Sequence, residues 1–176
     1  MRKPLALVAL ALSAVLFVGI QPAFAAGRTT ESVPAHVGLP IDGACGFTAL
    51  ATQRDPRTLT TWTDRRDSVV LQTLRTRTTT EYSGGSAGAL LLDENWLVTI
   101  KPNGDGSSTF VFVGRGAIWG TDSGLGQSFF QWVTGVVLMR GTYDVKSGVF
   151  LVSSKTVLGQ VTDLCESLTT GLKPRH

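Results

Sequence analysis

The clearest pattern in the chain is a turn at residues 102–106 with a run of apolar and alternating positions on either side. Over 96–101, Trp96, Val98 and Ile100 point one way and Leu97, Thr99 and Lys101 the other, and every position of 110–113 (FVFV) is apolar. The turn itself, PNGDG, contains residues that accept the backbone conformations of a hairpin. The pattern predicts two antiparallel strands. Because the second is apolar on both faces, we expect both of its faces to be covered.

The rest of the chain repeats this succession of strands and turns. Further strands are predicted in five segments, residues 45–53, 57–81, 89–92, 127–139 and 149–157. Glycines inside the apolar runs are typical of bulges or sharp bends. The fold class that follows is all-β, an antiparallel β-barrel of about seven or eight strands, with a β-sandwich as the alternative. Glycine kinks favour the barrel, because they let strands turn corners.

Both ends of the mature chain depart from this pattern. Residues 26–43 include the turn-favouring residues Pro34, Gly38 and Pro40 and show no periodicity, so we expect a flexible N-terminal arm there. Near the other end, Leu164 and Leu168 are spaced at i and i+4 behind a possible N-cap at Thr162, which predicts a short C-terminal helix. The predicted organisation is a single β-domain over residues 44–169, followed by a C-terminal tail, 170–176.

The first 25 residues have the pattern of a signal peptide. Arg2 and Lys3 precede an apolar run that is shorter than the roughly 20 residues of a comfortable membrane span. Small residues at Ala23 and Ala25 then suit a cleavage site. We therefore expect cleavage after Ala25, a secreted bacterial protein, and no membrane span once the leader is removed. An uncleaved N-terminal anchor is the alternative.

Charge and cysteine content extend this interpretation. The leader holds two of the 16 basic residues, which leaves 14 against 13 acidic ones. A nearly neutral mature chain gives no reason to expect nucleic acid as a partner. Cys45 and Cys165 are an even pair in an exported chain, and this predicts a disulfide bond between the first strand and the C-terminal helix. Closing so long a loop stabilises the fold by about 4–5 kcal/mol in the chain-entropy treatment.

Three short motifs give the chain a family resemblance. They are CGF at 45–47, the PNGDG turn, and GQVTDLCESL at 159–168. With these the chain resembles a group of uncharacterised secreted actinomycete proteins. The resemblance implies a β-barrel-like domain with a C-x-F…D-L-C disulfide framework, and it implies no activity and no catalytic residues. The chain departs from the group at 80–88, where TEYSGGSAG replaces a Thr-Asn…Thr-Gly-Lys hairpin.

Few residues offer catalytic chemistry. His36 lies in the expected arm and His176 is the last residue, so neither suits a Ser-His-Asp triad or a histidine zinc site. Disulfide pairing would also remove both thiols. What remains for an enzyme is a pair of carboxylates of the kind that glycosidases use, drawn from Asp93, Glu94, Asp122 and Asp144.

Two further clusters are explained without a ligand. Asn103, Asp105 and Ser107 alternate as calcium ligands do, but no bidentate acid follows, so turn chemistry is the preferred interpretation. Six arginines between residues 54 and 77 could bind phosphate or carboxylate. Three aspartates are interleaved with them, which favours a solvated face with salt bridges. We expect no metal and no cofactor.

Aromatic side chains are the remaining candidates for a binding site. The expected lining of a cavity inside the barrel is Trp96, Phe110, Phe112, Trp119 and Trp132, and the alternative is that these side chains fill the core. We therefore expect a secreted, non-catalytic β-barrel protein that binds a small apolar ligand or a cell-envelope or extracellular protein. The alternatives are a secreted enzyme, either a carboxylate-based hydrolase or a barrel cyclase, and a structural module of the envelope.

Overall fold

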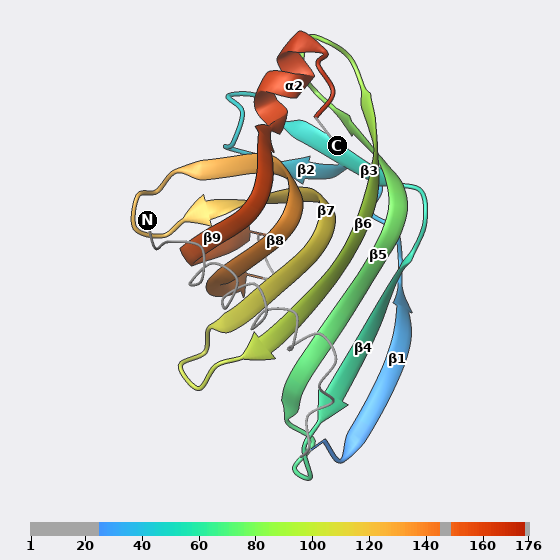
Figure 1. Ribbon diagram of the computed structural model, residues 1–176, viewed down its shortest axis with the longest axis vertical. Coiled ribbons are helices and arrows are strands. Elements are labelled where there is room, and N and C mark those ends of the chain that lie inside the picture. The colour runs from blue at the N-terminus through green and yellow to red at the C-terminus, as the bar shows by residue number, and fades with distance from the viewer. Residues whose placement is uncertain (1–24, 145–148, 175–176) are drawn as a thin grey trace, which may run out of the picture.

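The computed structural model describes residues 25–144 and 149–174, and it is built around one curved sheet (Figure 1). The expected signal peptide lies outside the described residues except for Ala25. The described strands are β1 (Gly27–Val33), β2 (Leu39–Ile41), β3 (Ala49–Gln53), β4 (Arg57–Thr63), β5 (Val69–Ser83), β6 (Leu90–Pro102), β7 (Ser108–Asp122), β8 (Ser128–Asp144) and β9 (Val149–Asp163), and the described helix is α2 (Leu164–Thr170). Within these residues, no helix has the length and apolar content needed to cross a membrane.

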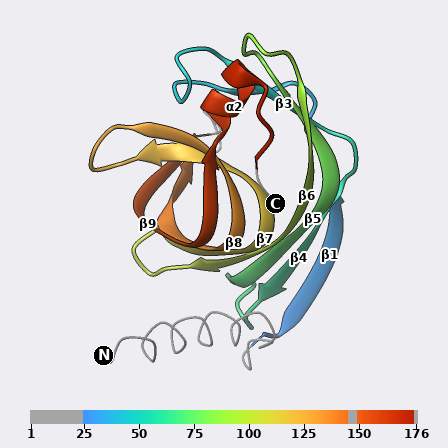
Figure 2. The same ribbon diagram turned by 45° about the horizontal axis from the view of Figure 1, so that its top comes forward.

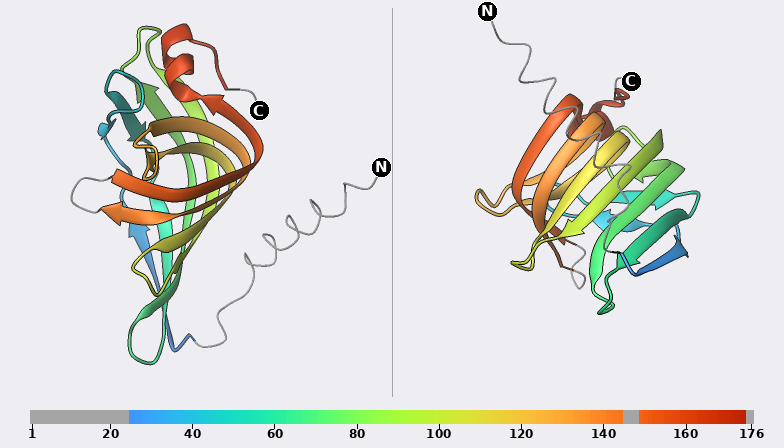
Figure 3. Two further views of the ribbon diagram at one scale, coloured as in Figure 1. Left: turned by 90° about the vertical axis from the view of Figure 1, so that its left-hand side faces the viewer. Right: turned by 60° about the horizontal axis from the view of Figure 1, so that its bottom comes forward.

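Seven strands follow one another across the sheet in the order β1-β4-β5-β6-β7-β8-β9, and each neighbouring pair is antiparallel. β5 has two partners on one edge, with β4 along its first half and β3 along its second, and β2 continues the sheet beyond β3. The last three strands curl so strongly that β7 meets β9 in a short parallel pairing at Thr121 and Asp122 (Figures 2 and 3). The sheet is therefore rolled at its C-terminal side and open at β1.

The prediction of an all-β fold is confirmed, but the predicted barrel is wrong. The nine strands form one sheet that does not close, and there is no second sheet of a sandwich among the described residues. Gly114, Gly135 and Gly159 explain the difference, because they are paired side by side across β7, β8 and β9. Their φ angles are +129°, +140° and +146°, a region that favours glycine. This row bends the last three strands onto themselves instead of toward β1.

The structure also has more strands than the seven or eight predicted. β1 and β2 both lie within residues 26–43, where the sequence predicted an arm without regular elements. β1 pairs with β4 along its whole length, yet five of its seven residues are exposed. An edge strand with both faces in water has no alternation of apolar and polar residues, so the hydrophobic pattern did not predict β1.

The predicted long strand over residues 57–81 is in fact a hairpin of β4 and β5. Its turn is stabilised by Asp64, whose carboxylate accepts hydrogen bonds from the backbone N–H groups of Arg66 and Ser68 at 2.8 and 3.0 Å. Asp67 completes the turn with a φ of 58°, a conformation that aspartate tolerates better than most residues. Two of the three aspartates interleaved with the arginines, Asp64 and Asp67, therefore form this turn.

Two hydrophobic clusters fill the inside of the curved sheet. The first lies beneath α2 and includes the buried side chains of Tyr82, Trp132 and Leu164. The second lies between β6 and the rolled strands, and it includes Trp96 and Val133. Because the consecutive residues Trp132 and Val133 belong to different clusters, the β7–β8 ribbon is buried on both faces where it passes between them. The part of β7 that is buried on both faces therefore begins after Gly114, beyond the segment 110–113 for which the sequence predicted it.

The predicted disulfide between Cys45 and Cys165 is present and fastens α2 to the loop between β2 and β3. The helix itself begins later than predicted. Asp163 is its N-cap, since its carboxylate accepts hydrogen bonds from the N–H groups of Cys165 and Glu166. Gly171 ends the helix in the left-handed conformation. Leu164 and Leu168 of the helix belong to the first hydrophobic cluster, and both cysteines pack against it. Figure 2 shows α2 above the end of the sheet.

The glycine row gives a first testable prediction. We expect Gly135→Ala to lower the free energy of unfolding by more than about 2 kcal/mol. A Cβ at residue 135 would lie 2.2 Å from the backbone oxygen of Leu158, and the φ angle of this residue disfavours alanine. Gly104→Ala is the matched control, because a Cβ at residue 104 meets nothing within 4 Å. Urea denaturation of both variants measures the effect, and equal losses of stability would contradict the assignment.

Candidate functional site

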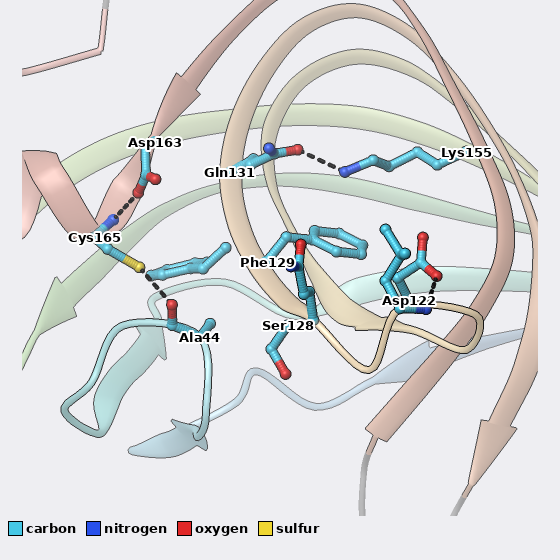
Figure 4. A pocket seen from close by; sticks show the side chains of 11 residues that line it. Ala44, Asp122, Ser128, Phe129, Gln131, Lys155, Asp163 and Cys165 are labelled. Carbon is cyan, nitrogen blue, oxygen red and sulfur yellow. Dashed lines mark hydrogen bonds between the residues drawn. The ribbon is translucent and has the colours of Figure 1, made fainter.

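A cleft of about 320 Å³ opens where the β7–β8 turn, the middle of β9 and the start of α2 come together (Figure 4). One wall consists of Phe129 and Gln131 on β8 and Lys155 on β9. Asp122 and the 72% exposed Leu125 form the rim at the β7–β8 turn. The other end is formed by Ala44, Asp163 and Cys165, next to the disulfide.

Lys155 reaches this cleft because β9 belongs to the rolled part of the sheet. It pairs with Met139, whose side chain is 2% exposed, so Lys155 occupies a position on the inward face of the strand. The roll brings the beginning of β8 opposite this face. The Nζ atom then lies 3.7 Å from the centroid of the Phe129 ring and donates a hydrogen bond to Oε1 of Gln131 at 2.9 Å.

The charge of Lys155 is only partly compensated. Withdrawal of the ammonium group from water lowers its pKa, and the negative charge of Asp122 opposes this effect. The described residues contain one salt bridge, Arg140–Asp105, and Lys155 is not part of it. Its direct partners are therefore an aromatic face and an amide oxygen, both neutral. A cation held in this way is available to an anionic group that enters the cleft.

The two carboxylates at the cleft are occupied by the backbone. Asp122 accepts hydrogen bonds from the N–H groups of Gly124 and Leu125 at 2.8 and 2.9 Å. Asp163 caps α2, with hydrogen bonds of 2.7 and 3.2 Å to backbone N–H groups. Both side chains thus hold local structure, a turn and a helix start. The side chain of Asp144, another acid considered from the sequence, lies outside the described residues.

A second polar group is buried in the sheet, away from the cleft lining. Glu94, 5% exposed, accepts a hydrogen bond from the hydroxyl of Tyr82 and another, of 3.3 Å, from the N–H of Ala117. Burial raises the pKa of Glu94, and its hydrogen bonds with Tyr82 and Ala117 oppose the rise. The pKa of Tyr82 is raised well above its usual value, first by burial and then by the Glu94 charge.

Glu94 stands at the point where the sheet divides. The pairing of β6 with β7 ends at Asn95 and Arg115, beyond which β7 turns away. The N–H of Ala117 has left the ladder with β6 there, and the Glu94 carboxylate supplies an acceptor in place of a backbone carbonyl. We interpret the Glu94–Tyr82 pair as a support for this branch rather than as catalytic machinery.

The five aromatic candidates for a cavity lining do not meet at one site. Trp132 is buried in the first hydrophobic cluster, and Trp119 packs against that cluster. Trp96 is buried in the second, with Phe110 and Phe112 packed against it. The ring centroids of Trp96 and Phe112 are 5.6 Å apart in an edge-on arrangement. None of the five lines the cleft.

The alternating residues of the 102–106 turn interact with one another and with β8. The carboxylate of Asp105 accepts hydrogen bonds from the N–H and the hydroxyl of Ser107 at 3.1 and 2.6 Å. It also forms a salt bridge of 2.5 Å with Arg140. These hydrogen bonds, those of Ser107 first, lower the pKa of Asp105 to about 2. The turn chemistry proposed from the sequence accounts for these side chains.

Comparison of the chain with protein-family models, with curated proteins and with solved structures finds no match. The cleft is therefore interpreted from its own geometry. Sequence reasoning missed Lys155 because it stands in the polar run SSKT, which is typical of a solvated strand. Only the buried position of its strand partner, Met139, identifies the inward face, and that partnership depends on a register that the sequence does not specify.

The buried carboxylate gives a second testable prediction. Folding raises the pKa of Glu94, so its contribution to stability is fully present below the unfolded pKa and is lost as pH rises through the folded pKa. Glu94→Gln keeps an acceptor for Tyr82 and Ala117 but removes the titration. We expect this variant to gain stability relative to the native protein between pH 4 and pH 8, by about 1.4 kcal/mol for each pH unit that separates the two pKa values.

Urea denaturation across this pH range measures the difference. Glu81→Gln is the matched control, because Glu81 lies on the neighbouring strand with its side chain exposed. We expect this control to lack the gain in stability of Glu94→Gln, because the exposed Glu81 side chain is not withdrawn from water. A difference that stays constant with pH for Glu94→Gln would show that the carboxylate titrates alike in both states.

Proposed function

We propose that the protein is a secreted, non-catalytic binding protein, and that its ligand is a small molecule with an apolar body and an anionic head group. The observation that carries this proposal is the half-buried Lys155 ammonium group, held at the cleft by neutral partners. An anionic head group would supply the charge that Lys155 lacks. This refines the apolar ligand expected from the sequence into an amphipathic one.

The shape and lining of the cleft support a ligand of this kind. Its volume of about 320 Å³ falls at the lower end of the range of small-molecule sites, about 300–1,000 Å³. The Phe129 ring and the exposed Leu125 side chain offer apolar contact near the cation. The ligand's body would remove Leu125 from water, which is favourable at about 25 cal/mol per Å² of apolar surface.

The same residues argue against a hydrolase at this site. A carboxylate mechanism requires one acid to donate a proton and another to attack or to activate water. Both cleft carboxylates already accept two backbone hydrogen bonds each, so their oxygens are engaged in holding a turn and a helix start. Lys155 would then be left as the one side chain poised for proton transfer among the lining residues. Binding of an anionic ligand, unlike hydrolysis, requires no second ionisable side chain beside Lys155.

Ligand titration tests this proposal. We expect octanoate to bind the purified protein at least tenfold more tightly than octanol, because the two share a body and differ in the head group. We expect Lys155→Met to remove this preference, a loss of about 1.4 kcal/mol for octanoate. Isothermal titration calorimetry of both ligands provides the affinities.

Lys101→Met is the matched control, since Lys101 is exposed on β6 and does not line the cleft. It should leave the affinity for octanoate unchanged. Equal affinities for the two ligands, or an unaltered preference in Lys155→Met, would contradict an anion site at Lys155.

Export is the second part of the proposal. The disulfide between Cys45 and Cys165 is compatible with an extracellular protein. If the leader is cleaved as its sequence suggests, N-terminal sequencing of protein from the culture medium will begin at Ala26. Retention in the cell fraction with an intact N-terminus would support the uncleaved anchor instead.

A further inference from the structure

The outward face of the sheet carries an apolar patch that the hydrophobic clusters do not use. In the strand register, four side chains of the patch stand side by side across β6, β7, β8 and β9, and two more stand in the adjoining row. The patch consists of Leu97, Val113, Val136 and Leu158 in the first row and Val111 and Leu138 in the second. Leu138 is 44% exposed, and the others are half-buried.

The patch is a consequence of strands that are apolar on both faces. In β7, Phe112 packs against the second hydrophobic cluster, while Val111 and Val113 point to the opposite side. The same holds in β8, where Val137 is fully buried and Leu138 is exposed. This face is the convex side of the roll, whose curvature Figure 3 shows, and the strand register places the patch on it. No described element of the chain covers it.

Positive charge surrounds the patch. Its two rows and the rows on either side contain the basic residues Arg75, Arg77, Lys101, Arg115 and Arg140 and no carboxylate. Arg75, Arg77 and Lys101 are exposed. Arg140 alone among the five takes part in the salt bridge of the described residues, with Asp105 of the neighbouring turn. The charge of this face is therefore strongly positive, although the mature chain is almost neutral.

We propose that the convex face of β5–β9 docks on a membrane surface that contains anionic phospholipid. Guanidinium groups bind phosphate with two parallel hydrogen bonds, which suits the arginines around the patch. Apolar side chains inside such a ring of cations match the boundary between head groups and acyl chains. A plane of phosphates above an apolar layer complements both features of this face at once.

The docking surface and the cleft use opposite sides of the same strand. Lys155 lies on the inward face of β9, whereas Thr156 and Leu158 stand in the outward rows. Membrane docking would therefore leave the cleft free to take up a ligand. The proposal does not depend on the cleft's function, and each can fail without the other.

Co-sedimentation with vesicles tests the proposal on the purified protein. One set of vesicles contains phosphatidylcholine alone, and the other contains phosphatidylcholine and phosphatidylglycerol in equal parts. We expect at least tenfold stronger binding to the mixed vesicles, with a steep loss as salt is added, because salt screens exposed charges. Absence of this preference would overturn the proposal.

Two matched pairs of variants locate the contact. Arg75→Glu combined with Arg115→Glu should weaken binding to the mixed vesicles at least tenfold, whereas Arg65→Glu with Arg66→Glu, the same charge change in the β4–β5 turn, should weaken it no more than about twofold. Leu138→Ser should weaken binding severalfold, and Leu125→Ser at the cleft should leave it unchanged. Far-UV circular dichroism confirms that each variant is folded, and Lys101→Glu replaces the first double variant if that one does not fold.

The outcomes separate a membrane from other partners. Equal effects of the two arginine double variants would show that net charge, not this face, governs binding, and would overturn the proposal. Soluble polyphosphate that binds as tightly as the vesicles, together with an unchanged affinity in Leu138→Ser, would identify a site for a soluble polyanion instead. Loss of binding confined to the variants of the convex face supports the membrane contact.

Discussion

The alignment of three glycines across β7, β8 and β9 is the constraint on which the rest of the structure depends. At each of these positions a Cβ would lie 2.0–2.2 Å from a backbone oxygen of the adjacent strand, so the three strands can bend together only without side chains there. The bend rolls β8 and β9 over β6 and encloses the second hydrophobic cluster. It also turns Lys155 toward Phe129 and leaves the convex face outside. Both proposed surfaces follow from this one backbone feature.

The bend removes a backbone hydrogen bond between β6 and β7, and the carboxylate of Glu94 replaces the missing acceptor. Where a strand separates from its neighbour, buried backbone N–H groups lose their acceptors. A buried donor without a partner destabilises the fold. The carboxylate accepts from Ala117 at this point, and Tyr82 donates to it in turn. Burial of the carboxylate is itself unfavourable, as the raised pKa shows. The fold thus exchanges one unsatisfied backbone group for a buried polar pair whose hydrogen bonds are satisfied.

Local signals in the sequence predicted those parts of the fold that depend on neighbours along the chain. The hairpin at 102–106 and the terminal helix belong to this class. The Cys45–Cys165 disulfide joins distant residues, and it was predictable because the chain contains only these two cysteines. β1 could not be predicted, because an exposed edge strand has no alternation, and its partner β4 lies beyond an intervening pair of strands. The predicted barrel was wrong because glycines within strands indicate that the strands bend but do not specify the direction of the bend. Lys155 was missed since only its partnership with Met139 reveals that it faces inward.

Charge is the property in which composition and structure differ most. From composition alone, the 14 basic and 13 acidic residues that follow the expected leader predict no preference for an anionic partner. The strand register separates the two signs in space. Several aspartates accept backbone N–H groups at the ends of elements, Asp64 and Asp122 at turns and Asp163 as the N-cap of α2. The arginines of β5 and β7 stand on strands, on one face of the sheet. A chain of nearly zero net charge therefore presents a cationic surface, because turn formation and sheet pairing place opposite charges in different parts of the fold.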